Sequence, residues 1–144
     1  MNETITMTIN KQKNIALIAH DPKKKLMQNF CIAYRGILEH HDVYSTETTG
    51  RLVEEASGLN VHKFLAGHLG GVEQIATQIE SNQIDMVIFL RENSMSQPHN
   101  NDFHNISTLC DVYNIPLASN LATAELLIKA LERGDLDWRS LYKN

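Results

Sequence analysis

Hydrophobic residues along the chain form two alternating patterns: short, continuous apolar runs, and longer segments with apolar residues at helical spacing. The continuous runs have the length of strands that are buried on both faces, and they lie at 14–20, 43–45, 61–65, 84–90 and 115–118. A segment with helical spacing follows each run, at 21–40, 49–57, 72–80, 102–113 and 122–133. Strand and helix thus alternate with short connections, which predicts a doubly wound parallel sheet with helices on both faces.

Residues at the ends of the helical segments support this division. Asp21 followed by Pro22 predicts a helix start, with the aspartate as N-cap and proline at the first helical position. Gly58 and Gly134 directly follow two other helical segments, where glycine commonly ends a helix.

The pattern indicates a single domain. We predict that it spans residues 13–144 and that the polar segment 1–12 is disordered or loosely attached. The tail, 135–144, contains three large apolar residues that we expect to pack on the domain: Trp138, Leu141 and Tyr142.

Composition narrows the class of protein. The chain has 144 residues, and 42% of them are hydrophobic, as in an ordinary globular domain. Its net charge is −4, so it lacks the excess of basic residues that is typical of nucleic-acid-binding proteins. Cys31 and Cys110 lie far apart within helical segments, which predicts buried free thiols in a reducing compartment. The sequence shows no signal peptide, no run of transmembrane length and no cluster with metal-ligand spacing. We therefore expect a cytoplasmic protein with no metal, cofactor, nucleic-acid partner or membrane partner.

The stretch Ser45–Gly50 is the first candidate for chemistry. Three threonines and a glycine lie where a predicted strand meets a helix, and the free amide groups and dipole of a helix start attract an oxyanion. A phosphate would fit there. The alternative is that Thr48 or Thr49 is only an N-cap and that Gly50 eases the turn.

Polar residues also follow the other predicted strands, and topology connects them. In a doubly wound sheet, ligands bind beyond the carboxyl ends of the strands, so these groups should lie in one crevice. The glycine-rich turn at 67–71 suggests backbone brought close to a ligand, although it matches no phosphate-binding fingerprint. The residues expected at the crevice are His20, Asp21, Thr46–Thr49, Gly67–Gly71, Glu92, His99, Asp102 and Asn120.

From Lys13 almost to its end, the chain resembles the methylglyoxal synthase family. The stretches that carry the resemblance are 15–21, 44–50, 67–71, Pro98-His99 with Asp102, and 115–124. The resemblance implies a flavodoxin-like, five-stranded parallel sheet and usually a homohexamer. It also implies an enzyme that removes a proton from dihydroxyacetone phosphate, passes through an enediolate and expels phosphate to leave methylglyoxal.

The resemblance implies roles for several residues. It places the substrate phosphate on Lys24, Thr46, Thr48, Thr49 and the backbone near Gly67. His20 and His99 would face the carbonyl end, with His99 donating to the enediolate oxygen, Asp102 holding its ring and Asp21 lying beside the reacting carbons. Without the resemblance, the two histidines could merely satisfy carbonyl groups at strand ends.

Five departures from the family pattern fall on the same strand ends. Val72 stands where the family has the aspartate that acts as catalytic base, and valine cannot accept a proton. The others replace a serine, a proline, a glycine and an Asp-Pro pair of the family, at Ala66, His68, Glu47 and Glu92-Asn93 respectively.

Two functions are compatible with these residues. One is a methylglyoxal synthase in which Asp21 or Glu73 has taken over proton abstraction. The other is a catalytically impaired protein that senses or sequesters a phosphorylated small molecule, with a nucleotide-type signal as the best guess. The loss of the base and the more apolar crevice favour the second hypothesis. It adds Ala66, Gly70, Gly71 and Val72 to the expected ligand contacts.

Overall fold

A computed structural model of the chain describes residues 12–93 and 100–142. Its five strands form one parallel sheet in the order β3-β2-β1-β4-β5. The order reverses between β1 and β4, which makes that pair the topological switch point. The strands are β1 (Asn14–Ala19), β2 (Asp42–Ser45), β3 (Val61–Lys63), β4 (Met86–Leu90) and β5 (Leu117–Ala118).

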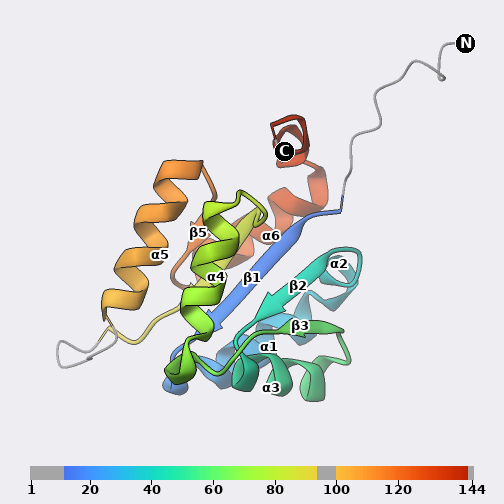
Figure 1. Ribbon diagram of the computed structural model, residues 1–144. Helices are drawn as coiled ribbons and strands as arrows, with labels where there is room; N and C mark the ends of the chain where they lie inside the picture. Colours follow the sequence, from blue (N-terminus) through green and yellow to red (C-terminus); the bar gives the residue numbers. More distant parts are fainter. Residues whose placement is uncertain (1–11, 94–99, 143–144) are drawn as a thin grey trace, which may run out of the picture.

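Helices cover both faces of the sheet (Figure 1). The α-helices are α1 (Lys24–Ala33), α2 (Arg35–Leu38), α3 (Glu47–Ser57), α4 (Gly71–Glu80), α5 (Asn100–Tyr113) and α6 (Leu121–Arg133). The short 3₁₀ turns among the described residues are η2 (Asp21–Lys23), η3 (Gly67–Leu69) and η4 (Asp137–Leu141). The predicted doubly wound, flavodoxin-like α/β fold is confirmed.

Successive residues of the central strand point to opposite faces, and each face has its own hydrophobic core. Ile15 and Leu17 pack with α1, α3 and α6, whereas Ala16 and Ile18 pack with α4 and α5. Cys31 belongs to the first core and Cys110 to the second. Both thiols are free, and burial raises the pKa of each to about 12, so the prediction of buried free cysteines is confirmed.

The segment after β1 differs from the single helix predicted over 21–40. It divides into η2, α1 and α2, with a break at Tyr34, whose backbone lies outside the helical region at φ −111° and ψ 23°. His20 caps η2, and Asp21 is its first residue rather than the N-cap. The amphipathic spacing continues across the break because α1 and α2 both contribute to the first core, which is why the pattern alone could not reveal it.

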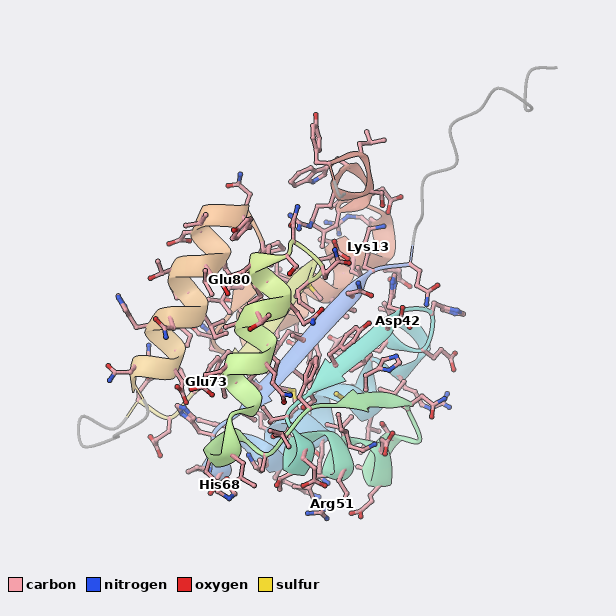
Figure 2. The ribbon with its side chains drawn as sticks, viewed as in Figure 1. Lys13, Asp42, Arg51, His68, Glu73 and Glu80 are labelled. Carbon is pink, nitrogen blue, oxygen red and sulfur yellow. The ribbon has the colours of Figure 1, made fainter. Side chains whose placement is uncertain are left out.

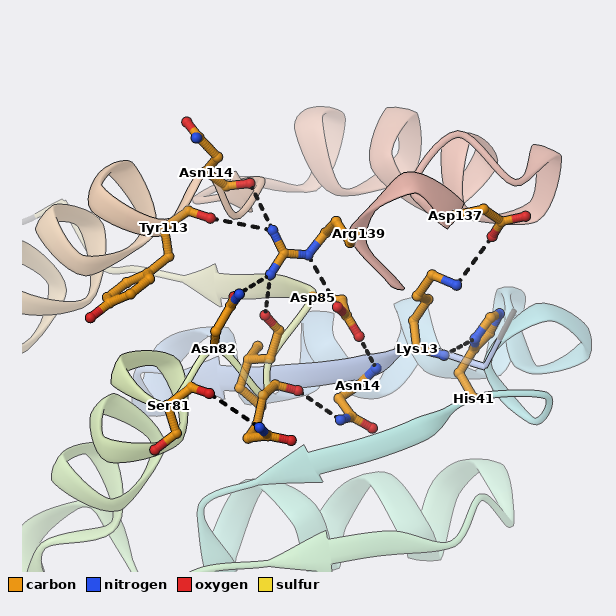
Figure 3. Close-up of polar contacts among 12 residues, drawn as sticks. Lys13, Asn14, His41, Ser81, Asn82, Asp85, Tyr113, Asn114, Asp137 and Arg139 are labelled. Carbon is orange, nitrogen blue, oxygen red and sulfur yellow. Dashed lines mark hydrogen bonds and ion pairs between the residues drawn. The ribbon is translucent and has the colours of Figure 1, made fainter. Parts of the chain in front are cut away.

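A polar cluster ties the C-terminal turn to the amino end of the sheet (Figure 3). Arg139 is 3% exposed, and its Nε donates to Asp85 Oδ1 over 3.1 Å while its other nitrogens donate to carbonyls that include those of Tyr113 and Asn114. The predicted apolar docking of the tail is wrong, because Trp138, Leu141 and Tyr142 remain 44%, 53% and 71% exposed. The buried Arg139 anchors the tail, and Leu136 packs against the first core.

Two predictions lie at or beyond the limits of the described chain. The predicted loose segment 1–12 lies outside the described residues except for Gln12, and so does His99. Within the described part of the chain, no helix is long and apolar enough to span a membrane.

Candidate functional site

A cavity of about 280 Å³ lies at the carboxyl ends of the strands, beside the β1–β4 switch point. Many of the predicted residues meet here, although they come from segments far apart in the sequence. The lining residues are Ile18, Ala19, His20, Asp21, Pro22, Lys24, Thr46, Thr48, Gly67, His68, Val72, Phe89 and Asp102.

Two contacts at the end of β1 fix the orientation of the His20 ring and which of its nitrogens carries the proton. The backbone N–H of Glu92 donates to His20 Nδ1 over 2.8 Å, and the ring packs edge-on against Phe89 with centroids 5.3 Å apart. Because Nδ1 accepts this hydrogen bond, the neutral ring carries its proton on Nε2. His20 is therefore oriented as a hydrogen-bond donor from Nε2.

Lys24 and Asp21 form an ion pair at the start of α1. Lys24 Nζ lies 3.2 Å from Asp21 Oδ1 and donates to the carbonyl of Ala19 over 2.6 Å. The lysine side chain is 18% exposed and the aspartate 93%, so the ammonium group is held in the cavity wall while the carboxylate lies at the mouth. This arrangement suits a fixed cation for an anionic ligand.

The start of α3 differs in part from both interpretations of the stretch Ser45–Gly50, as a phosphate site and as a helix cap only. Thr46, not Thr48 or Thr49, is the N-cap, and its side chain makes no capping hydrogen bond among the described residues. The prediction that Thr48 or Thr49 is only a cap is therefore wrong. Thr46 and Thr48 line the cavity, and the first turn of α3 begins at the same end of the sheet. Its Glu47 amide donates to the Leu65 carbonyl over 3.2 Å, which leaves the amides of Thr48 and Thr49 as the donors for a ligand.

Two other residues of this turn lie away from the cavity. Glu47 points along α3, where its carboxylate lies 3.5 Å from Arg51 Nε and accepts from the hydroxyl of Thr48. Its negative charge is thus not among the groups that line the site. Thr49 is 1% exposed and packs behind the wall, and its hydroxyl has no hydrogen-bond partner among the described residues.

The glycine-rich turn is fixed by close backbone contacts. Ala66 accepts hydrogen bonds from Leu69 N and Gly71 N, which closes η3. A Cβ on Gly71 would lie 1.9 Å from the carbonyl oxygen of Leu65, so only glycine fits there. Gly67 and His68 line the cavity, whereas Ala66, Gly70 and Gly71 form the scaffold behind them.

Val72 and Asp102 line the cavity from the first turns of α4 and α5, two helices that pack on the same face of the sheet. Val72 is in the first turn of α4, 6% exposed and part of the second core, and it gives this wall an apolar surface. Asp102 is in the first turn of α5. Phe89 also lines the cavity and was missed because a strand-interior phenylalanine indicates only core; its position next to the end of β4 is the available signal.

Three acidic or amide side chains lie elsewhere. Glu92 contributes its backbone N–H to His20, but it does not line the cavity. Asn120 caps α6, where its Oδ1 accepts from Thr123 N over 3.0 Å. Glu73 is exposed on α4 and also does not line the cavity (Figure 2).

Comparisons with known proteins agree on one family. Residues 26–119 match the family model described as MGS-like domain. The methylglyoxal synthase of Caldicellulosiruptor saccharolyticus is 63% identical over 128 residues, which cover 89% of this chain and 91% of that protein. The methylglyoxal synthase of Listeria welshimeri is 55% identical over 131 residues, which cover 91% of this chain and 98% of that protein.

A solved structure gives the same result. The crystal structure of methylglyoxal synthase from Elizabethkingia anophelis NUHP1 matches with a TM-score of 0.74 and 36% identity, over 85% of this chain and 80% of that one.

These similarities overturn the functional hypothesis that was drawn from Val72 and its neighbours. A catalytically impaired protein that senses or sequesters a nucleotide-type signal was predicted, and this prediction is wrong, because relatives 55% to 63% identical over nearly the whole chain are named methylglyoxal synthase. The five departures at the strand ends, Val72 among them, do not outweigh this similarity.

Proposed function

Because the chain belongs to the methylglyoxal synthase-like family, we propose that it is a methylglyoxal synthase, a carbon–oxygen lyase that converts dihydroxyacetone phosphate to methylglyoxal and phosphate. The observation that carries this proposal is the 63% identity over 89% of the chain to a protein of that name. The cavity supports it, since it presents a lysine, two threonines, two histidines and two aspartates in one place.

The size of the cavity favours a small substrate. A volume of about 280 Å³ is at the lower end of the range for ligand pockets, roughly 300–1,000 Å³, and suits a triose phosphate better than a nucleotide. We propose that Lys24, Thr46, Thr48 and the amides of the first turn of α3 hold the phosphate group. The carbonyl of Ala19 and the carboxylate of Asp21 would hold the Lys24 ammonium group in position for this contact.

The opposite end of the substrate would then lie near His20. In the reaction, a proton leaves the hydroxymethyl carbon, and its electron pair forms a double bond to the carbonyl carbon, giving an enediolate. A neutral His20 that donates from Nε2 stabilises the developing oxyanion. The double bond then shifts as the hydroxyl group loses its proton and becomes an aldehyde, and phosphate departs with the electrons of its C–O bond and takes up that proton. The remaining enolate gains a proton at its methylene carbon to give methylglyoxal.

Because of Val72, a methylglyoxal synthase with this sequence must use a different residue to accept the substrate's proton. Valine cannot accept the proton, so the acceptor has to be another side chain of the cavity. Glu73 is not suited to that task, because it is exposed on α4 and away from the lining (Figure 2). The roles of His99 and of a homohexamer stay predictions; His99 lies outside the described residues.

The proposal is tested by incubating the purified full chain with dihydroxyacetone phosphate and measuring methylglyoxal and inorganic phosphate over time. The 63%-identical relative serves as the positive control. We expect both products in equal amounts, at a rate well above that of buffer alone. A rate equal to the buffer background, in a protein that is folded by circular dichroism, would overturn the proposal.

A further inference from the structure

The missing proton acceptor has a replacement in the same wall of the cavity. We propose that the imidazole of His68 is the general base of this enzyme, an inference that rests on the proposed synthase function. His68 lies on η3, directly after Gly67 and four residues before Val72, and both His68 and Val72 line the cavity. Figure 2 shows it on the turn that leads into α4.

The turn places His68 next to the position that the base would otherwise occupy. A Cβ built on Gly67 would lie 3.9 Å from Val72 Cγ2, so the valine packs against the residue that precedes His68. Hydrogen bonds from Leu69 N and Gly71 N to the Ala66 carbonyl hold the turn, and the contact of Gly71 with the Leu65 carbonyl prevents it from moving inward. The side chain of His68, which this fixed turn carries, can therefore provide a proton acceptor at the wall where Val72 presents only an apolar surface.

The other titratable groups of the cavity are less suited to accept the proton. His20 accepts at Nδ1 from Glu92 N and so presents a donor. Asp21 is paired with Lys24, whose Nζ lies 3.2 Å from Asp21 Oδ1. Asp102 is on α5, where the family resemblance gives it the task of orienting His99. Histidine exchanges protons near neutral pH, which suits general-base catalysis.

The proposed step is balanced within the site. A neutral imidazole nitrogen of His68 takes the proton from the hydroxymethyl carbon, and the carbon's electron pair forms the enediolate double bond. The proton of the substrate hydroxyl passes to the departing phosphate, and the imidazolium returns its own proton to the methylene carbon of the remaining enolate, which restores the neutral ring. The step requires no oxidant, reductant or further reactant.

The first test compares wild type with His68→Ala and His68→Asn, using dihydroxyacetone phosphate as substrate. Loss of a positioned general base lowers kcat by about 10²–10⁴-fold, and we expect KM to change little. The substrate's hydroxymethyl protons should also stop exchanging with D₂O. Leu69→Ala is the matched control, because Leu69 is 62% exposed on the same turn and does not line the cavity.

The second test restores a base at the other position. In the His68→Ala background, Val72→Asp should recover much of the lost kcat and should shift the acidic limb of the pH profile to lower pH, since a carboxyl group loses its proton at lower pH than an imidazole. Added imidazole should also partly rescue His68→Ala. A merely structural role for His68 would produce neither result.

The outcomes separate this inference from the function on which it depends. If wild type makes methylglyoxal but His68→Ala and His68→Asn retain kcat within about twofold, the inference is wrong and Asp21 or Asp102 becomes the base. If the folded wild type makes none while the relative does, the proposed function fails, and this inference fails with it.

Discussion

At the amino end of the sheet charged side chains are buried against one another, whereas at the carboxyl end polar side chains line an open cavity. Arg139 and Asp85 are 3% and 0% exposed and paired at 3.1 Å, and buried Lys13 lies 3.1 Å from Asp137 (Figure 3). At the other end, the cation of Lys24 faces a space of about 280 Å³. The difference teaches that charge alone does not mark a site. Arg139 and Lys13 are enclosed by protein groups and hold the fold together, whereas Lys24 has protein partners and also faces a cavity in which a ligand can contact it.

The largest effect on stability should come from Arg139→Ala. Removing one partner of a buried ion pair leaves Asp85 buried with its charge uncompensated, which costs about 3–5 kcal/mol of unfolding free energy. Urea denaturation measures this loss. Arg133→Ala is the control, because Arg133 pairs with Asp135 at an exposed position and should cost at most about 1 kcal/mol. Equal losses in the two variants would contradict the contrast between buried and exposed pairs.

The next effect is on substrate affinity, at the opposite end of the sheet. Lys24→Ala removes a charged donor to the phosphate, worth roughly 1.5–3 kcal/mol, so KM should rise about tenfold to hundredfold. Steady-state kinetics with dihydroxyacetone phosphate gives KM, and a thermal melt should show little change. Lys25→Ala, an exposed neighbour, should leave KM unaltered. An unchanged KM in Lys24→Ala would remove Lys24 from the proposed phosphate site.

A smaller pair of effects separates the cavity wall from the layer behind it. Thr48→Val removes a hydroxyl that lines the cavity, and we expect KM to rise severalfold, since one hydrogen bond is worth about 1 kcal/mol. Thr49→Val replaces a buried hydroxyl that has no partner among the described residues, so the melting temperature should stay the same or rise while KM stays constant. A higher KM for Thr49→Val would place Thr49 in contact with the substrate.

The smallest effect concerns pH at the amino end. His41 Nδ1 accepts the backbone N–H of Lys13 over 2.9 Å, and burial, followed by the charge of Lys13, lowers the pKa of His41. The unfolded chain therefore binds a proton more readily, so stability should fall as pH drops below about 6.5, the ordinary histidine pKa. His41→Asn can still accept that hydrogen bond but does not titrate, and its urea midpoint should fall less between pH 7 and pH 5.5.

A matched variant checks that assignment. His104→Asn, at an exposed position on α5, should keep the wild-type pH dependence. If both variants behave alike, the acid sensitivity does not originate at His41.

Sequence periodicity predicted the fold well because each strand and helix has a continuous buried side. It could not predict the break at Tyr34, since hydrophobic spacing continues through it. Nor could it predict that Arg139 anchors the tail, because an arginine between Trp138 and Ser140 resembles a solvated one until Asp85 and the Asn114 carbonyl are placed around it.

The site was predictable in position and less so in detail. That strand ends meet in one crevice follows from topology, and His20, Lys24 and Thr48 do line the cavity. Which residues of each turn face inward depends on where a helix begins: α3 starts at Glu47, two residues earlier than predicted, and Thr49 is therefore rotated behind the wall. The function was the least accurate prediction, because it was based mainly on the absence of a proton-accepting side chain at Val72.

The most direct test of the central claim is a single NMR experiment on dihydroxyacetone phosphate in D₂O with the purified wild-type chain. The account predicts that the ³¹P signal of the substrate converts to inorganic phosphate while methylglyoxal accumulates in equal amount in the ¹H spectrum. Its methyl group should carry deuterium gained from solvent when the enolate takes up a proton. Binding of the substrate with no conversion, under conditions in which the 63%-identical relative turns it over, would contradict the account.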